Sequence, residues 1–210
     1  MGYNSHPKIM KKLFYSFIML VAMSLTFVAC EQKNPDDNKQ EIKSNCEFFV
    51  CQYSIDETGH AMYVFEFSTN GLDIVNAKGS GDYLVLMAYA KPGADGFPTE
   101  NTYKLIPFEE LANSEEWEEC IIGPYAMSET QLIGTFAYII ENDEAKDILL
   151  CTSAEVKFEG NKTNGTIIAN LELESALTGD IVTKEYIYSG AMNLEEAKAA
   201  APSRVMKLNK

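Results

Sequence analysis

The chain has very few basic residues, and arginine is almost absent. Arg204 is the only arginine among 210 residues, and 17 Lys and Arg residues face 31 Asp and Glu residues, for a formal net charge of −14. A surface this acidic repels phosphate backbones, which argues against nucleic acid as a partner. It also provides no basic patch for anionic lipid headgroups.

Residues that carry catalysis or hold metals are also scarce. His60, in the segment ETGHAM, is the only histidine beyond residue 29, so a Ser–His–Asp or Cys–His site would have to use it. A polar residue beside glycine in a hairpin turn is typically solvated, and we predict no catalytic residue. The cysteines show no paired spacing such as CxxC, and neither GxxxxGK[ST] nor GxGxxG occurs, so we predict no metal and no cofactor. The alternative is a hydrolase that uses two of the many carboxylates.

The sequence contains one long apolar run, at residues 13–29, LFYSFIMLVAMSLTFVA, which has no charged residue. Lys8, Lys11 and Lys12 precede this run, and the small residue Ala29 ends it. Basic, apolar and small residues in that order predict a secretory signal peptide over residues 1–29. A short membrane-spanning helix that is not cleaved and a cleaved soluble product are the alternatives. Cleavage removes three lysines and no acid, so the net charge becomes −17.

The end of the apolar run, Phe27-Val28-Ala29-Cys30, resembles the lipobox of bacterial lipoproteins, although leucine is usual where Phe27 stands. The resemblance implies that Cys30 carries a diacylglycerol and that acyl chains hold the protein on a membrane. Residues 30–45 are polar apart from Ile42, which predicts a disordered tether. Acidic residues in this tether, among them Glu31, are similar to the surface-export signal of Bacteroidetes lipoproteins. We therefore expect an outer-membrane location, facing the periplasm or the cell surface.

Beyond the tether, short β-type segments alternate with turns rich in Gly, Asn and Asp. Residues 61–69 place Tyr63, Phe65 and Phe67 on one face, and residues 82–90 are apolar on both faces, as in a covered central strand. Segments of this kind recur every 8–12 residues, which predicts an all-β fold: an antiparallel β-barrel or β-sandwich of about 8–10 strands.

We expect one β domain over residues 46–194 and a C-terminal tail over residues 195–210. One segment, residues 107–120, breaks the β pattern with Phe108 and Leu111 at helical spacing. It predicts a short helical or acidic-loop insertion between two strands.

Four cysteines remain for the β domain, namely Cys46, Cys51, Cys120 and Cys151. In an exported domain they permit two disulfides with three connectivities. Cys46 and Cys51 are five residues apart on one predicted strand, an odd spacing that would put them on opposite faces. The alternative is that several of them are small buried hydrophobic residues.

The aromatic residues around the acidic insertion are the candidates for a ligand site. Aromatic rings offer a large rigid contact area for sugars and apolar ligands. Trp117 lies within the insertion and Tyr125 follows it, so we predict a site formed by Trp117, Tyr125 and Tyr103. Alternatively, Trp117 anchors the insertion to the sheet.

The order of segments also resembles a group of uncharacterised Bacteroidetes lipoproteins with lipocalin-like or β-barrel domains. The resemblance rests on Asn101-Thr102-Tyr103, on TIIANLELES at 166–175 and on Tyr188-Ser189-Gly190-Ala191-Met192. It implies a lipid-binding role and supplies no catalytic residues. We therefore expect a lipid-anchored, non-enzymatic module that binds an apolar small molecule or a glycan, inside the barrel or against Trp117. The alternative is an accessory protein of a surface assembly that binds a protein partner.

Overall fold

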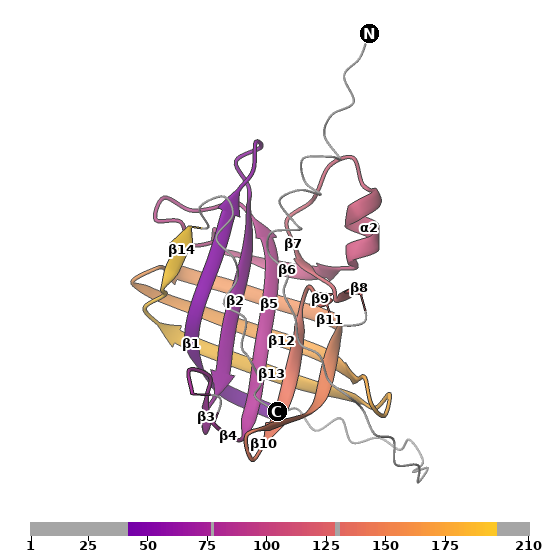
Figure 1. Cartoon of the computed structure of the whole chain (residues 1–210). Coiled ribbons are helices and arrows are strands. Elements are labelled where there is room, and N and C mark those ends of the chain that lie inside the picture. Colours follow the sequence, from indigo (N-terminus) through magenta and orange to yellow (C-terminus); the bar gives the residue numbers. More distant parts are fainter. Residues whose placement is uncertain (1–41, 77, 129–130, 197–210) are drawn as a thin grey trace.

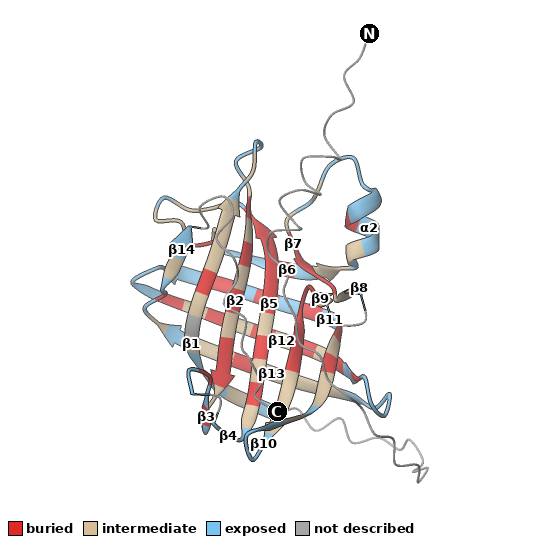
Figure 2. Ribbon diagram, in the orientation of Figure 1, coloured by how far each residue is buried: buried red, intermediate tan, exposed pale blue. Residues whose placement is uncertain are grey.

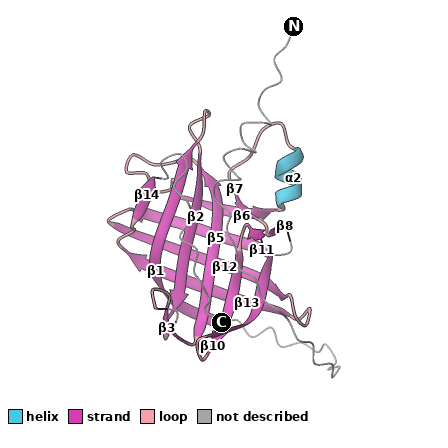
Figure 3. Cartoon of the chain, viewed as in Figure 1, coloured by secondary structure: helices cyan, strands magenta, loops and turns pink. Residues whose placement is uncertain are grey.

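The computed structural model describes residues 42–76, 78–128 and 131–196, and these form an all-β structure with one short helix (Figure 1, Figure 3). The predicted all-β class is confirmed. The predicted signal peptide, Cys30 and most of the C-terminal tail lie outside the described residues. The elements are β1 (Ile42–Ile55), β2 (Ala61–Thr69), β3 (Leu72–Asp73), β4 (Lys78–Gly79), β5 (Gly81–Ala90), β6 (Asn101–Ile106), α2 (Phe108–Asn113), β7 (Cys120–Ile122), β8 (Tyr125–Ser128), β9 (Gln131–Ile133), β10 (Phe136–Glu141), β11 (Glu144–Asn161), β12 (Asn164–Ser175), β13 (Ile181–Gly190) and β14 (Leu194–Glu196).

Seven strands pair in a closed ring, in the order β10, β11, β12, β13, β1, β2 and β5, with β5 returning to β10. Every pairing in the ring is antiparallel except that of β1 with β13, which is parallel over Ile42–Asn45. A ring with an odd number of strands cannot reverse direction at every step, so one parallel pair is unavoidable. The sheet is therefore mixed, whereas the sequence pattern predicted antiparallel strands only.

Three further strands bring the sheet to ten. β7 pairs with β5, and β6 pairs with both β7 and β11, so these two strands add a second hydrogen-bonded path between β5 and β11. β14 pairs in parallel with the end of β1. The two small hairpins β3–β4 and β8–β9 stand apart from this sheet.

Side chains fill the interior of the ring. The alternation predicted for residues 61–69 is confirmed, because Tyr63, Phe65 and Phe67 of β2 are buried in the interior core. Buried and partly buried positions alternate along this strand (Figure 2). Leu171 and Leu173 of β12 are buried on the facing side. A small void between inward-facing residues such as Phe67 is too small to hold a water molecule. In the described part of the chain, the ring interior is thus a packed core.

The sequence prediction for Cys46 and Cys51 is wrong about their faces. The pairing of β1 with β2 shifts register between Phe48 and Val50, which inserts one extra residue into β1. The extra residue reverses the alternation, so Cys46 and Cys51 both pack against the interior core despite their odd spacing. A bulge of this kind depends on the partner strand, and the sequence of β1 alone does not reveal it.

The last four residues of the predicted tether form the start of a strand. β1 begins at Ile42, and Ile42–Asn45, which we assigned to the tether, pair with Lys184–Ile187 of β13. These residues are polar apart from Ile42, so their own composition does not predict a strand. The parallel partner supplies the hydrogen bonds that hold them in place.

A second apolar layer covers part of the outer face of the ring. Met87 and Tyr89 of β5 point outward and are buried with Leu111 of the predicted helical insertion, which is confirmed as α2. Pro107 precedes this helix, as suits the first turn of a helix. The prediction that residues 82–90 are covered on both faces is confirmed for residues 86–90, whereas Tyr83 and Val85 on the outer face are only half-buried. Within the described ranges, no helix is long and apolar enough to cross a membrane.

The ring has two distinct ends. At one end, which we call the base, lie the start of β1, the β3–β4 hairpin, the turn at 142–143 and the turn at 176–180 (Figure 1). The other end, the rim, carries the β1–β2 turn, the loop at 91–100 and the insertion with α2. The loop at 91–100 closes the rim, because Phe97 is buried in the core and the Tyr63 hydroxyl donates to the Gly96 carbonyl at 2.9 Å.

Near the base, one ion pair crosses the ring interior. Asp82 of β5 accepts a hydrogen bond from Lys184 Nζ at 2.6 Å and another from the Tyr186 hydroxyl at 2.7 Å, both from β13. Each side chain of the ion pair is only 12% exposed. β5 and β13 are not neighbours in the ring, so this cluster joins opposite walls of the interior.

Candidate functional site

A cluster of polar and aromatic side chains lies at the rim, where three segments distant in sequence meet. The β1–β2 turn, the end of β5 and the acidic insertion each contribute to it. We call it the rim site, and its members are Asp56, Thr58, His60, Tyr89, Trp117 and Glu119.

Asp56 organises the turn that begins the site. Its Oδ1 accepts hydrogen bonds from the Thr58 amide at 2.8 Å, the Thr58 hydroxyl at 2.7 Å and the His60 amide at 3.2 Å. Gly59 has a φ of 82°, which a glycine adopts without strain. Burial would raise the pKa of Asp56, but the hydrogen bonds from Tyr89, Thr58 and His60 outweigh that effect and lower it. The site therefore contains a carboxylate that stays charged.

Tyr89 connects the turn to the sheet. Its hydroxyl donates to Asp56 Oδ2 at 2.6 Å, and its ring stacks on His60 with centroids 5.3 Å apart. Burial, helped by the bond to Asp56, raises the pKa of Tyr89 to about 12. The tyrosine is thus a fixed neutral donor at neutral pH.

The position of His60 in the turn predicted that its side chain is simply solvated, but the structure gives the imidazole two partners. Its Nδ1 lies 2.9 Å from Thr58 Oγ1, and its Nε2 lies 3.6 Å from Glu119 Oε1. The Thr58 hydroxyl donates to Asp56 Oδ1 at 2.7 Å, and the tautomer of the imidazole decides whether His60 Nδ1 donates to Thr58 Oγ1 or accepts from it. The charged Asp56 carboxylate therefore competes with His60 for the Thr58 hydroxyl proton.

Trp117 joins the insertion to the sheet, the alternative role considered for it. Its ring meets that of Tyr89 edge-on, with centroids 5.3 Å apart and an angle of 76°. It is half-buried against the outer cluster that contains Leu111. Tyr125 lies elsewhere around the insertion, on β8, where its ring contacts Phe108 at 4.9 Å.

Tyr103 is placed mainly in the core, not on the surface. It is buried, its ring contacts Phe158 at 5.3 Å, and its hydroxyl donates to the Thr99 carbonyl at 2.9 Å. Burial, helped by the nearby Glu119 carboxylate, raises the pKa of Tyr103 to about 12. Glu119 therefore interacts with both His60 and Tyr103.

The four domain cysteines are free thiols in the structure. Cys46, Cys51 and Cys151 belong to the interior core, and Cys120 belongs to the outer cluster. Burial raises the pKa of Cys120 and of Cys151 to about 12. Among the residues that the structure describes, no three His, Cys, Asp or Glu side chains are grouped to hold a metal ion.

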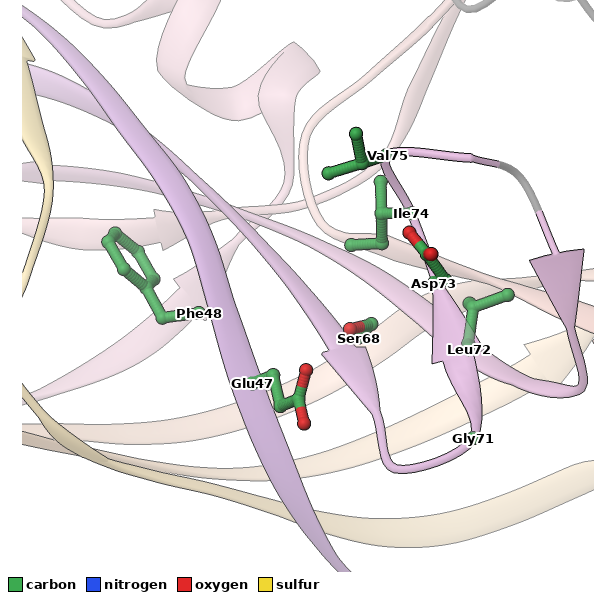
Figure 4. Close-up of a pocket in the computed structure, with 8 residues that line it drawn as sticks. All are labelled: Glu47, Phe48, Ser68, Gly71, Leu72, Asp73, Ile74 and Val75. Atoms are coloured by element: carbon green, nitrogen blue, oxygen red, sulfur yellow. The ribbon is translucent and has the colours of Figure 1, made fainter.

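A separate groove of about 390 Å³ lies near the base, between β1 and the β3 segment (Figure 4). Glu47 forms one wall, Ser68 lies at its floor, and Ile74 and Val75 form the opposite wall. The Asp73 carboxylate at this groove is already engaged by the Asn76 amide and side chain. None of the sequence-predicted ligand residues lines the groove.

Sequence reasoning selected Trp117 but missed most of its partners. Asp56 and Tyr89 are 33 residues apart, and Glu119 was one of many acidic residues in its segment. The available signal was the turn Asp56-Glu57-Thr58-Gly59-His60, in which an Asp side chain can bond to amides two residues on. That signal predicts a turn but does not identify which distant residues meet it.

Three comparisons with known proteins, covering family models, curated sequences and solved structures, each found no match. The structure defines a mostly-β protein with a large mixed sheet that closes partly into a ring. The lipocalin-like resemblance expected from the sequence has no support beyond this fold class.

Proposed function

We propose that the chain is an exported module, anchored to a membrane by acyl chains on Cys30, that binds a glycan at the rim site without acting as an enzyme. The observation that carries this proposal is the rim site itself. It combines the rings of His60, Tyr89 and Trp117 with two carboxylates at one end of the domain. The apolar run at residues 13–29 and the lipobox-like sequence that ends at Cys30 support export and anchoring.

A glycan suits the chemistry of this site better than an apolar ligand inside the ring. Side chains already occupy the interior, so an apolar molecule would have to displace Tyr63 or Phe65. At the rim, the apolar faces of a sugar ring can pack on the aromatic side chains. The sugar hydroxyls can donate to the partly exposed carboxylate of Glu119, whose side chain is 30% exposed.

Binding is also favoured over nucleophilic catalysis by the hydrogen bonds of the turn. The Thr58 hydroxyl contacts the imidazole of His60, but it also donates to Asp56 Oδ1 at 2.7 Å. The charged Asp56 carboxylate competes with His60 for this proton, which supports binding over nucleophilic catalysis.

The test uses Trp117, the only tryptophan in the chain, as an intrinsic reporter. The protein is titrated with neutral gluco-, manno- and xylo-oligosaccharides while tryptophan emission and calorimetric heat are followed. The Glu119→Gln substitution keeps the shape but removes the charge, and we expect it to weaken binding about 10-fold or more, the cost of a hydrogen bond to a charged group. Glu118→Gln changes the adjacent exposed acid and serves as the matched control.

Two results would contradict the proposal. One is the absence of any emission change or heat across the oligosaccharide panel. The other is an equal loss of affinity in Glu118→Gln and Glu119→Gln, since a site built on Glu119 requires the two to differ. Either result would shift the preferred function to the alternative, an accessory protein that binds a protein partner.

A further inference from the structure

Large apolar side chains are exposed unevenly over the domain. Among the described residues, five large hydrophobic side chains are exposed, and four of them lie at the base. The exposed fractions at the base are 44% for Ile42, 74% for Val75, 56% for Leu177 and 54% for Ile181. The fifth is Ile55, at 49%, which ends β1 at the rim.

The four base residues come from separate segments that the topology gathers at one end. Ile42 starts β1, Val75 is at the tip of the β3–β4 hairpin, and Leu177 and Ile181 flank the turn between β12 and β13. These segments lie at the same end of the ring, with the β3–β4 hairpin at the lower left and the β12–β13 turn at the lower right of Figure 1, whereas the insertion and α2 lie at the top. The groove walled by Ile74 and Val75 adjoins the same end.

The chain enters the domain at this end. Ile42 is twelve residues after Cys30, and the tether predicted between them from the sequence would have a mean reach of about 20 Å as a flexible coil. An acylated Cys30 would therefore hold the base, and not the rim, close to the lipid headgroups. Nonpolar side chains on turns that face a bilayer can enter its interfacial region, where burial of apolar area favours binding.

We propose that the base of the domain rests on the bilayer, with Val75, Leu177 and Ile181 inserted among the lipid headgroups and the rim site directed away from it. This inference rests on the proposed acylation of Cys30. It adds the orientation of the domain and the surface that contacts the lipid.

The charges at the base specify which lipid surface it fits. Asp73, Asp143 and Asp180 are exposed on the same turns, and Lys78 is an exposed cation among them. The base therefore has no excess of positive charge, and anionic headgroups would not attract it. The matching surface is zwitterionic, such as phosphatidylethanolamine mixed with phosphatidylcholine.

The experiment reconstitutes the full acylated protein into vesicles of phosphatidylethanolamine and phosphatidylcholine that contain a brominated lipid, which quenches nearby tryptophan. Wild-type Trp117 reports on the rim, and we expect its emission to be insensitive to the brominated lipid. Val75→Trp adds a reporter at the base, whose emission should shift to the blue and be quenched. Ile55→Trp is the matched control, because it replaces an exposed hydrophobic residue at the opposite end.

The outcomes test the orientation of the domain on the bilayer separately from the acylation of Cys30. Quenching in Val75→Trp but not in Ile55→Trp supports the proposal. Equal quenching of the two, or none in either, overturns the orientation if the acylated protein remains on the vesicles, and leaves the anchor intact. Failure to acylate Cys30 or to retain the protein on vesicles overturns both. An emission shift in Val75→Trp that depends on protein concentration without lipid would instead assign the base to contacts between copies.

Discussion

The ion pair that crosses the ring interior makes a sharp prediction about stability. Asp82 and Lys184 are 102 residues apart in sequence and each is almost fully enclosed, so neither can recover water when its partner is removed. We expect Asp82→Asn and Lys184→Met each to destabilise the domain, because each leaves one charge buried without its counter-charge. Tyr186 can still donate to the residue at position 82, but it cannot neutralise a charge.

The magnitude follows from the geometry. Removing one member of a well-enclosed ion pair costs about 3–5 kcal/mol, whereas replacing both members by neutral groups is often close to neutral. With a urea dependence of about 2 kcal/mol per molar for a domain of this size, each single variant should lower the unfolding midpoint by about 2 M. The double variant should be more stable than either single variant.

The assay is equilibrium urea unfolding of the four proteins of the double-mutant cycle, followed by Trp117 fluorescence and far-ultraviolet circular dichroism. A double variant that is more stable than either single variant would assign the cost to the interaction between Asp82 and Lys184. If each single variant lost less than about 1 kcal/mol, or if the two effects simply added, the ion pair would not join the walls of the ring as reasoned.

Two further predictions concern ionisable groups elsewhere in the fold. Burial raises the pKa of Glu66 above its ordinary value of 4.5, although a hydrogen bond from the Tyr83 hydroxyl opposes the shift. The folded state then holds this proton more tightly than the unfolded chain, so stability falls as the pH rises through the raised pKa. We expect Glu66→Gln to unfold at a higher urea concentration than the wild type at neutral pH and at the same concentration below pH 4.5. If the variant still unfolded at a higher urea concentration below pH 4.5, burial of the Glu66 carboxylate would not be the cause of its added stability. Because burial raises the pKa of the Cys120 and Cys151 thiols to about 12, native protein should react slowly with a thiol-specific disulfide reagent, and four domain thiols should react in urea. Fewer than four reactive thiols in urea would indicate a disulfide instead.

Patterns of local spacing were enough to predict most of the longer strands and the helix, but not short strands such as β7, β8 and β14. The alternation at Tyr63, Phe65 and Phe67 gave the buried face of β2, and the helical spacing of Phe108 and Leu111 gave α2. Each of these patterns reflects burial on one face, which is a property of consecutive residues. The same reasoning gave the tether and the signal peptide, which lie largely outside the described residues.

Pairing between distant strands decided what the local patterns could not. The extra residue in β1 turned Cys46 and Cys51 to the same face, and the parallel pairing with β13 converted Ile42–Asn45 from tether to strand.

The rim site and the interior ion pair both depend on contacts between residues that are distant in sequence. Asp56 meets Tyr89, and Asp82 meets Lys184, only once the register of every intervening strand is fixed. The sequence by itself therefore determined most of the longer strands and which of their faces are apolar, because those depend on neighbours along the chain. Which polar groups meet across the ring was decided by the tertiary structure alone, because closure of the ring sets those distances.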